Sequence, residues 1–198
     1  DTFNVTPALA ITASGRFNLA TIDLTDNLGT SLTGNSRYAR FNPAIGATYK
    51  FSPEVTAYAG YSEGNRVPTP SEIECSNPAL PCLLPSSLSS DPPNLNQVVS
   101  HTYEAGLRGK FHMPTVVPGG FTWNFGLFRT DLDDDIYGVA TTISSGFFEN
   151  IGATRRQGIE TGIAYRDATW SAFINYSLVD ATFQSPLRTC AVSGRKSG

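Results

Sequence analysis

The sequence predicts an all-β protein, an antiparallel up-and-down β-barrel that spans a membrane, present here as an incomplete fragment of about seven strands. Three observations predict this fold. Apolar and polar residues alternate with a period of two along segments about twice as long as the ~5–6 residues of an ordinary strand. Short turns alternate with long loops, as they do in outer-membrane barrels. Charged residues make up 16% of the chain, below the ~25% usual for soluble domains, which fits a surface partly exposed to lipid.

The clearest predicted strand runs from Phe41 to Phe51. Its odd positions are apolar or aromatic and its even positions are small or polar, so one face of the strand is apolar. Residues 41–51, at about 3.3 Å per residue and tilted by ~45°, cross roughly 26 Å, close to the height of the apolar band of an outer-membrane barrel. The two terminal phenylalanines match the aromatic girdles at the membrane interfaces.

Six further segments repeat the two-residue period, which disfavours helices along most of the chain. The first of them is noisier, because Ile22 and Leu24 change sides, and Phe128 and Phe173 are apolar exceptions on polar faces. In chain order the segments are 8–24, 54–62, 101–111, 121–128, 158–166 and 170–178.

The connections between these segments fall into two length classes. Ser52-Pro53 and Asp167-Ala168 make tight turns, and 113–120 makes a somewhat longer one. The intervening links, 26–36 and 65–97, are long. In outer-membrane barrels the long loops face the outside of the cell, so we expect 65–97 to be an outer loop.

Composition excludes several classes of protein. A net charge of −3 gives no basic surface for nucleic acid. No apolar run approaches the ~18 residues of a spanning helix, and the N-terminus lacks the features of a signal peptide. An odd number of strands would leave unpaired edges in lipid. We therefore expect an interior piece of a longer precursor, with a partial barrel at 1–185 and a truncated outer loop or disordered tail at 186–198.

Three cysteines are present. Cys75 and Cys82 lie close together within the long loop, where they favour a local disulfide in an oxidising setting. Zinc is a poor alternative, because four ligands are needed and neither a histidine nor a second cysteine pair is nearby. No metal site is predicted, and Cys190 has no obvious partner.

Four segments resemble, in order and spacing, the barrel of TonB-dependent outer-membrane receptors. Tyr58–Glu72 is similar to the family's Tyr-x-x-x-Ser-Glu-Gly-Phe-Arg-x-Pro motif, with Asn65 at the usual aromatic position. His101–Gly109 resembles the Glu-x-Gly-x-(Arg/Lys)-Gly strand, and Asp133–Tyr137 and Glu149–Glu160 resemble two later strands.

The resemblance covers roughly 8–184. It implies an outer-membrane location, contact with outer-membrane lipid, and uptake of a scarce nutrient, with a ferric siderophore as the expected ligand. It also implies energy from a TonB complex, acting through a plug that these residues do not include. No cofactor, no nucleic-acid partner and no enzymatic activity are expected.

The charged positions of the strands indicate which face lines the lumen. An arginine or lysine at mid-depth on the lipid face would cost about 2–4 kcal/mol, so we expect these side chains to face inward. The predicted lumen-facing charges are Glu104, Arg108, Lys110, Glu160 and Arg166. Glycines share this face, where they permit close approach of a plug or relieve strand strain. They are Gly46, Gly60, Gly106, Gly126 and Gly162.

The long loop 65–97 is the candidate for ligand contact, the alternative being an ordinary solvated loop. Its charged candidates are Arg66, Glu72, Glu74 and Asp91. The acidic residues between 131 and 135 could bind calcium, but no EF-hand spacing follows them, so a solvated strand end is the better interpretation. Glu72 and Glu74 have no accompanying nucleophile or metal motif that would make them an acid/base pair.

Two other functions remain open from the residues alone. A porin-like channel would share the barrel but lack a plug. A soluble extracellular β-sandwich that binds carbohydrate would instead bury its apolar faces between two sheets and use Trp123 and Trp170 in its core or for sugar stacking.

Overall fold

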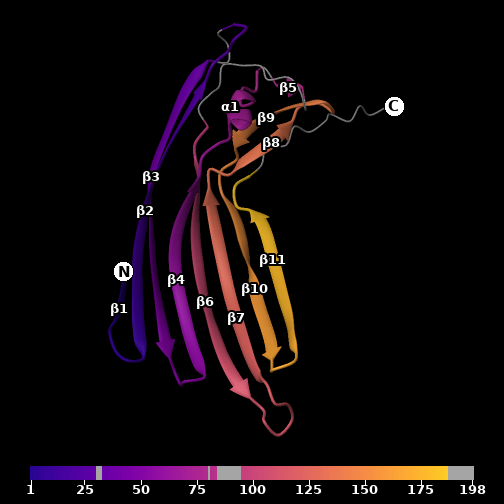
Figure 1. Ribbon diagram of the computed structural model, residues 1–198. Helices are drawn as coiled ribbons and strands as arrows, with labels where there is room; N and C mark the ends of the chain where they lie inside the picture. The colour runs from indigo at the N-terminus through magenta and orange to yellow at the C-terminus, as the bar shows by residue number, and fades with distance from the viewer. Residues whose placement is uncertain (30–32, 80, 84–94, 187–198) are drawn as a thin grey trace.

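The computed structural model describes residues 1–29, 33–79, 81–83 and 95–186. Eight antiparallel strands form one sheet in the order β1-β2-β3-β4-β6-β7-β10-β11, and β5, β9 and β8 form a small second sheet (Figure 1). The elements are β1 Thr2–Asn4, β2 Leu9–Leu24, β3 Gly34–Lys50, β4 Val55–Arg66, α1 Pro70–Glu74, β5 Cys82–Leu83, β6 Val98–His112, β7 Gly120–Asp133, β8 Ile136–Ala140, β9 Ser145–Asn150, β10 Thr154–Arg166 and β11 Ser171–Phe183.

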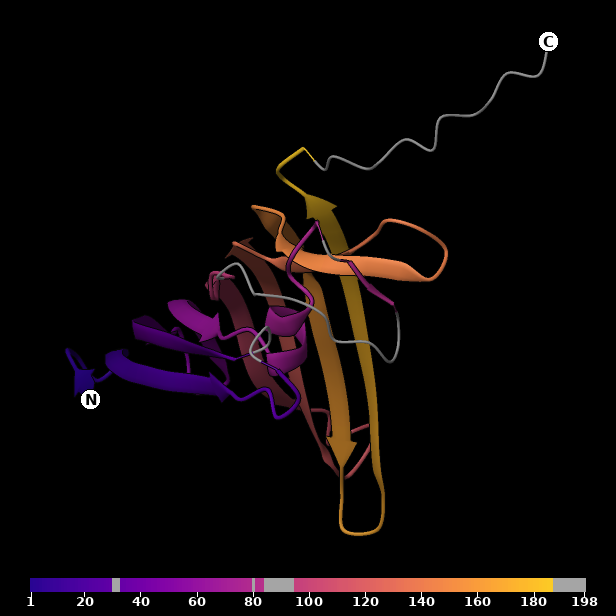
Figure 2. The same cartoon turned by 90° about the horizontal axis from the view of Figure 1, so that it is seen from above.

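The long strands confirm the predicted fold class. All seven predicted segments lie in the large sheet, joined to their sequence neighbours as in an up-and-down barrel. The sheet is not closed among the described residues: it follows an open arc, with β1 and β11 as its edges (Figure 2). Of the expected tail, only Pro186 lies within the described residues.

One face of the sheet carries the apolar residues and is called the outer face here. Ile45, Leu107 and Ile174 on this face are 56%, 39% and 72% exposed, so no second sheet among the described residues covers them. Large apolar side chains that are open to solvent across several strands fit contact with lipid rather than a protein interior. The exposed outer face therefore contradicts the β-sandwich alternative.

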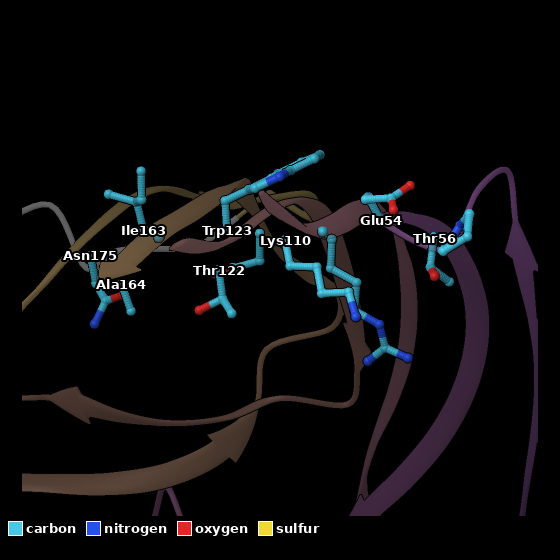
Figure 3. Close-up of a pocket in the computed structure, with 13 residues that line it drawn as sticks. Glu54, Thr56, Lys110, Thr122, Trp123, Ile163, Ala164 and Asn175 are labelled. Atoms are coloured by element: carbon cyan, nitrogen blue, oxygen red, sulfur yellow. The ribbon is translucent and has the colours of Figure 1, made fainter. Parts of the chain in front are cut away.

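Side chains alternate strictly between the outer face and the opposite, inner face. In Figure 3, Trp123 and Ile163 point to one side of the sheet, whereas Thr122, Lys110 and Asn175 point to the other. Neighbouring strands keep this alternation because residues of the same kind are Cα partners in the ladder, as Trp123 and Ile163 are. The faces assigned from the period of two are thus continuous across the large sheet, which we call the wall.

The short connections lie at one end of the wall and the long loops at the other, as predicted (Figure 1). The turn at Asp167 shows how a short connection is held. Its carboxylate accepts hydrogen bonds from the Tyr165 hydroxyl and from the backbone amides of Thr169 and Trp170. Together these donors, the Tyr165 hydroxyl first, hold the pKa of the Asp167 carboxyl below its ordinary value.

The five predicted inner-face glycines differ in what lies over them, and Gly162 faces the side chains of Asn124 and Asn175. A Cβ atom at Gly106 or Gly126 would lie 2.6 or 2.8 Å from the Tyr58 hydroxyl, so the aromatic ring of Tyr58 covers both. Gly46 and Gly60 meet only backbone atoms, at 3.4 Å or more. The chain's own side chains therefore fill part of the glycine surface that a plug was expected to approach, and the Gly46–Gly60 part stays open.

Candidate ligand site at the loop end of the wall

Two long loops form a single folded unit at the loop end, which we call the loop cap: α1, β5, β8 and β9. β5 comes from the connection between β4 and β6, and β8 and β9 come from the connection between β7 and β10. Cys82 pairs with Gly146 in the small sheet, and the Phe148 amide donates to the Cys75 carbonyl over 2.7 Å. The two loops consequently hold one another.

The predicted disulfide between Cys75 and Cys82 is confirmed. Both cysteines are buried, beside Ile73, which is 1% exposed. In the chain-entropy view, closing a loop this short stabilises the folded state by about 2.5 kcal/mol. Cys190 lies outside the described residues.

Apolar contacts join the loop cap to the inner face of the wall. Leu95, Val98 and Ile136 form a buried cluster, and Leu132 and Phe148 pack against it. Val98 lies on the same face of β6 as Arg108, because the two are an even number of residues apart. The cap therefore covers the inner face, and α1 lies on the concave side of the arc (Figure 2).

Two of the predicted ligand contacts hold α1 in place. The Arg66 guanidinium donates to both carboxylate oxygens of Glu72, at 2.8 and 3.2 Å. Glu72 also accepts from the Thr69 backbone amide, while the Thr69 side chain accepts from the Glu72 amide, which makes a capping box. Glu74 is the last residue of α1, and Asp91 lies outside the described residues. Ligand contact by these four residues stays a prediction.

Opposing influences act on the Glu72 carboxyl. Burial alone would raise its pKa, but the hydrogen bonds from Arg66 and from the Thr69 amide outweigh burial and lower the pKa below its ordinary value of 4.5. A carboxyl whose pKa is depressed in the folded state contributes stability above its ordinary pKa and loses that contribution as the pH falls.

We expect the loop cap to open more readily in acid, at pH values below about 4.5, because protonated Glu72 no longer attracts Arg66. The measurement is the rate at which a phosphine reductant that stays active in acid reduces the buried Cys75–Cys82 disulfide of the whole protein. Glu72→Gln keeps an acceptor for the capping box but cannot titrate, so its reduction rate should lack the acid-dependent rise. The same acid dependence in both proteins would contradict the prediction.

A split in the wall lies beside the loop cap. Pairing between β3 and β4 ends at Ala44 and Ser62, and beyond this point the ladder that β3 forms within the described residues is with β2 alone. Side-chain amides bridge the gap: Asn18 Nδ2 and Asn42 Nδ2 donate to Asn65 Oδ1, and Asn65 Nδ2 donates to Gln97 Oε1. The split is therefore closed by polar side chains instead of by a β-ladder.

A polar cleft of about 580 Å³ opens along this split. Tyr38 donates to the Leu95 carbonyl across it, and Gln97 donates to the Ala39 carbonyl. Guanidinium groups, amides and a phenol suit a ligand rich in oxygen acceptors. The lining includes Asn35, Arg37, Tyr38, Arg40, Asn96, Gln97 and Asp134. None of these residues was predicted, although the loss of alternation between 34 and 40 already sets that part of β3 apart from a lipid-facing strand.

The five predicted lumen charges share the inner face. The register places Arg108 beside Asn124, Glu160 beside Gly126, and Arg166 beside Gly120. Glu104 and Lys110 lie on the same face of β6 as Arg108. Within the described ranges no ion pair joins any two of the five.

A hollow of about 460 Å³ lies near the turn end of the wall (Figure 3). Arg108 and Lys110 line it, together with Thr122 and Asn175 from neighbouring strands. Arg108 and Lys110 bring two positive charges to the hollow, and Glu54, which also lines it, brings one negative charge. Whether the five charged residues line a lumen stays a prediction.

Two acidic residues near the end of β7 form ion pairs with arginines. Asp131 pairs with Arg129 at 2.8 Å and with Arg155 at 2.6 Å, and Asp135 lies 3.7 Å from Arg156. Among the described residues, no group of three or more histidine, cysteine or acidic side chains is arranged to hold a metal. In the same part of the chain, no helix has the length and apolar character needed to cross a membrane.

Comparisons with known proteins add three findings. The model of the family described as "TonB dependent receptor-like, beta-barrel" matches residues 1–195. No curated protein matches the chain significantly. Solved structures with the same fold include the copper transporter OprC, with a TM-score of 0.70 and 14% identity over 93% of this chain and 27% of that one.

Two further solved structures agree with this fold. The FrpB iron transporter from Neisseria meningitidis gives a TM-score of 0.61 and 14% identity over 89% of this chain and 24% of that one. The siderophore receptor PirA from Pseudomonas aeruginosa gives 0.60 and 15% over 90% and 32%. At such identities the likeness shows the fold alone. The chain spans about a quarter to a third of these proteins.

Proposed function

Because this chain belongs to the family of TonB-dependent receptors, as part of their β-barrel, we propose that the whole protein binds a ferric siderophore at its loop end and imports it with energy transmitted by TonB. The family consists of outer-membrane transporters rather than enzymes, and the chain is an outer-membrane protein. The observation that carries the proposal is the family match over residues 1–195.

The loop end has the chemistry that such a ligand needs. The cleft beside the loop cap offers Arg37, Arg40 and several amides, which complement the oxygen-rich, often anionic chelating groups of a ferric siderophore. Iron and siderophore transporters among the solved structures of the same fold support this ligand class. Copper transport by OprC leaves a copper ligand as the second candidate.

The hollow on the inner face supports a second part of the proposal. Arg108 and Lys110 line an open hollow, as a surface that receives a plug domain would. The Arg108 guanidinium lies 5.9 Å from the centre of the Tyr58 ring, a cation–π contact within the inner face. A TonB complex that pulls on such a plug is the proposed energy source.

Uptake of radioactive iron tests the proposal. Cells that lack the full-length gene should lose uptake of iron supplied with at least one siderophore of a hydroxamate, catecholate and carboxylate panel, and the restored gene should recover it. In a strain without TonB, the restored gene should give no uptake. Uptake that continues without TonB would instead support the porin-like alternative, and uptake of copper alone would favour the copper ligand.

A further inference from the structure

The loop-end part of β3 has one edge that no strand among the described residues covers. β3 pairs with β2 in an unbroken register from Gly34 to Tyr49, but its ladder with β4 extends only as far as Ala44. Residues 34–43 therefore have β2 on one side and the split on the other. The edge of a strand presents its backbone N–H and C=O groups in a row, ready to pair with another extended chain.

The direction of these backbone groups follows from the other end of β3. The Lys50 amide donates to the Ala8 carbonyl, on the β2 side, and the Phe51 amide donates to the Val55 carbonyl, on the β4 side. Backbone groups of successive residues in an antiparallel strand point to opposite edges. The register with β2 contains no bulge that would exchange the two edges. The odd-numbered residues of β3 therefore direct their N–H and C=O groups into the split.

Three odd-numbered residues of β3 line the cleft: Asn35, Arg37 and Ala39. Gln97 Nε2 donates to the Ala39 carbonyl over 3.3 Å, as expected for a carbonyl that points into the split. Within the described part of the chain, the Ala39 N–H and both backbone groups of Arg37 have no hydrogen-bond partner. The cleft thus offers a donor, an acceptor and a second donor at the spacing that an added β-strand uses.

This free edge is short. Beside the end of β4 the split is filled by side chains, because Arg40 pairs with Glu63 at 2.7 Å and Asn42 Nδ2 donates to Asn65 Oδ1. Gln97 occupies the Ala39 carbonyl, so an added strand cannot continue in that direction. The cleft volume of about 580 Å³ lies within the ~300–1,000 Å³ of small-molecule sites. A small ligand with a few peptide bonds fits this space better than a strand of a partner protein.

The rest of the lining adds amide groups and one available cation. Asn96 faces the cleft, and its backbone N–H and C=O are held by the Asn150 side chain at 2.9 and 3.2 Å. Its own side chain lies 3.4 Å from Asp134, the acidic residue of the lining. Arg40 already has an ion pair, whereas Arg37 has none with a described residue. Arg37 can therefore receive an anionic group of the ligand.

We propose that the cleft binds a siderophore whose iron-chelating groups are carried on a short peptide backbone, which pairs with the Arg37–Ala39 edge of β3. The Arg37 N–H and C=O bind one residue of the ligand, and the Ala39 N–H binds a carbonyl of a neighbouring residue. An anionic ligand without amides would leave these backbone groups unpaired, at a cost in affinity. The inference rests on the proposed function and narrows its ligand to the peptidic siderophores.

Calorimetric titration of the full-length receptor in detergent micelles with three iron complexes tests this ligand class. The probes are the ferric complex of a linear tripeptide of N-acetyl-N-hydroxyornithine, the same tripeptide with methylated backbone amides, and ferric citrate. Methylation keeps the hydroxamates and the charge but removes the backbone donors, so affinity should fall at least about tenfold. Ferric citrate, which has no amide, should also bind at least about tenfold more weakly than the unmethylated tripeptide.

Three results of this titration overturn the proposal. They are equal affinity for the two tripeptides, binding of ferric citrate as tight as that of the unmethylated tripeptide, and failure of the unmethylated tripeptide to bind.

A variant locates the contact on β3. Ala39→Pro removes the N–H that faces the cleft and keeps the carbonyl that Gln97 uses. Proline already stands on this edge at Pro43, where β3 stays paired with β2. Affinity for the tripeptide should fall about tenfold in Ala39→Pro. Unchanged affinity in the folded variant overturns the proposal, and the methylated tripeptide tests the same edge in the unaltered receptor if the variant does not fold.

The iron-uptake experiment separates this inference from the proposed function. If the gene supports uptake with non-peptidic siderophores alone, the peptidic ligand class is wrong and the transport function stands. If loss of the gene changes uptake with no siderophore, the proposed function itself is wrong.

Discussion

Replacement of Ile174 by arginine should destabilise the full-length receptor in a bilayer by about 2–4 kcal/mol, because the guanidinium would lie in hydrocarbon near mid-depth. Ile174 is on the outer face of β11, midway along the predicted apolar segment 170–178, and is 72% exposed. Its Cα partner in β10 is Ile163, which also points outward. Nothing within the described ranges covers this side chain, so lipid would be its surroundings.

The adjacent residue gives a matched control. Asn175 has the same depth and also lies in an exposed stretch of β11, but it points to the inner face (Figure 3). Asn175→Arg should therefore change stability by less than about 1 kcal/mol. The measurement is the denaturant midpoint for folding of each full-length variant into lipid vesicles. Equal losses at the two positions would show that the assignment of the faces is wrong.

The same physical distinction explains which parts of the fold can be predicted from the sequence. A strand between lipid and a polar interior has apolar surroundings on one face and polar surroundings on the other. Apolar and polar residues therefore alternate along its sequence with a period of two. The residues of β3 below the split obey it, and 41–51 was the clearest prediction. Beyond Phe41 the strand continues to Gly34 without that period, because its surroundings there are polar on both sides.

The loop cap lacked such a signal. β5 has two residues and β9 has six, and the latter packs against α1 and β5 instead of against a uniform medium. The start of α1 does have a local sequence signal, because Thr69-Pro70-Ser71-Glu72 has the capping box and the proline that are typical of a helix N-terminus. β1 is too short, at three residues, to show any period.

The candidate site was predicted only in part. The disulfide follows from two nearby cysteines in a long loop, so sequence spacing suffices. The cleft depends on where β3 and β4 stop pairing, and no short sequence pattern predicts the residue at which that pairing ends. Likewise, the contact of His101 with Asp133 joins residues that are 32 positions apart and becomes visible only when β6 and β7 are aligned.

Replacement of Ile73 by alanine should destabilise the loop cap by about 2–5 kcal/mol, the usual cost of truncating a fully buried aliphatic side chain. Ile73 is 1% exposed and is the buried residue of α1. The Cys75–Cys82 disulfide begins at the C-cap of α1, so it holds the chain on the C-terminal side of Ile73. Hydrogen exchange of the full-length receptor should show lost protection in α1 and β9.

Ser71→Ala provides the control, because Ser71 lies in the same helix and is exposed. This variant should retain protection in the cap to within about 0.5 kcal/mol. In Ile73→Ala, the strands β6 and β7 should keep their protection, because the ladder between them does not depend on α1. Protection lost equally from the cap and from these strands would mean that the cap does not open as a unit. A cap that opens alone would instead place the least stable part of the chain at the ligand cleft, where movement is needed for a ligand to enter.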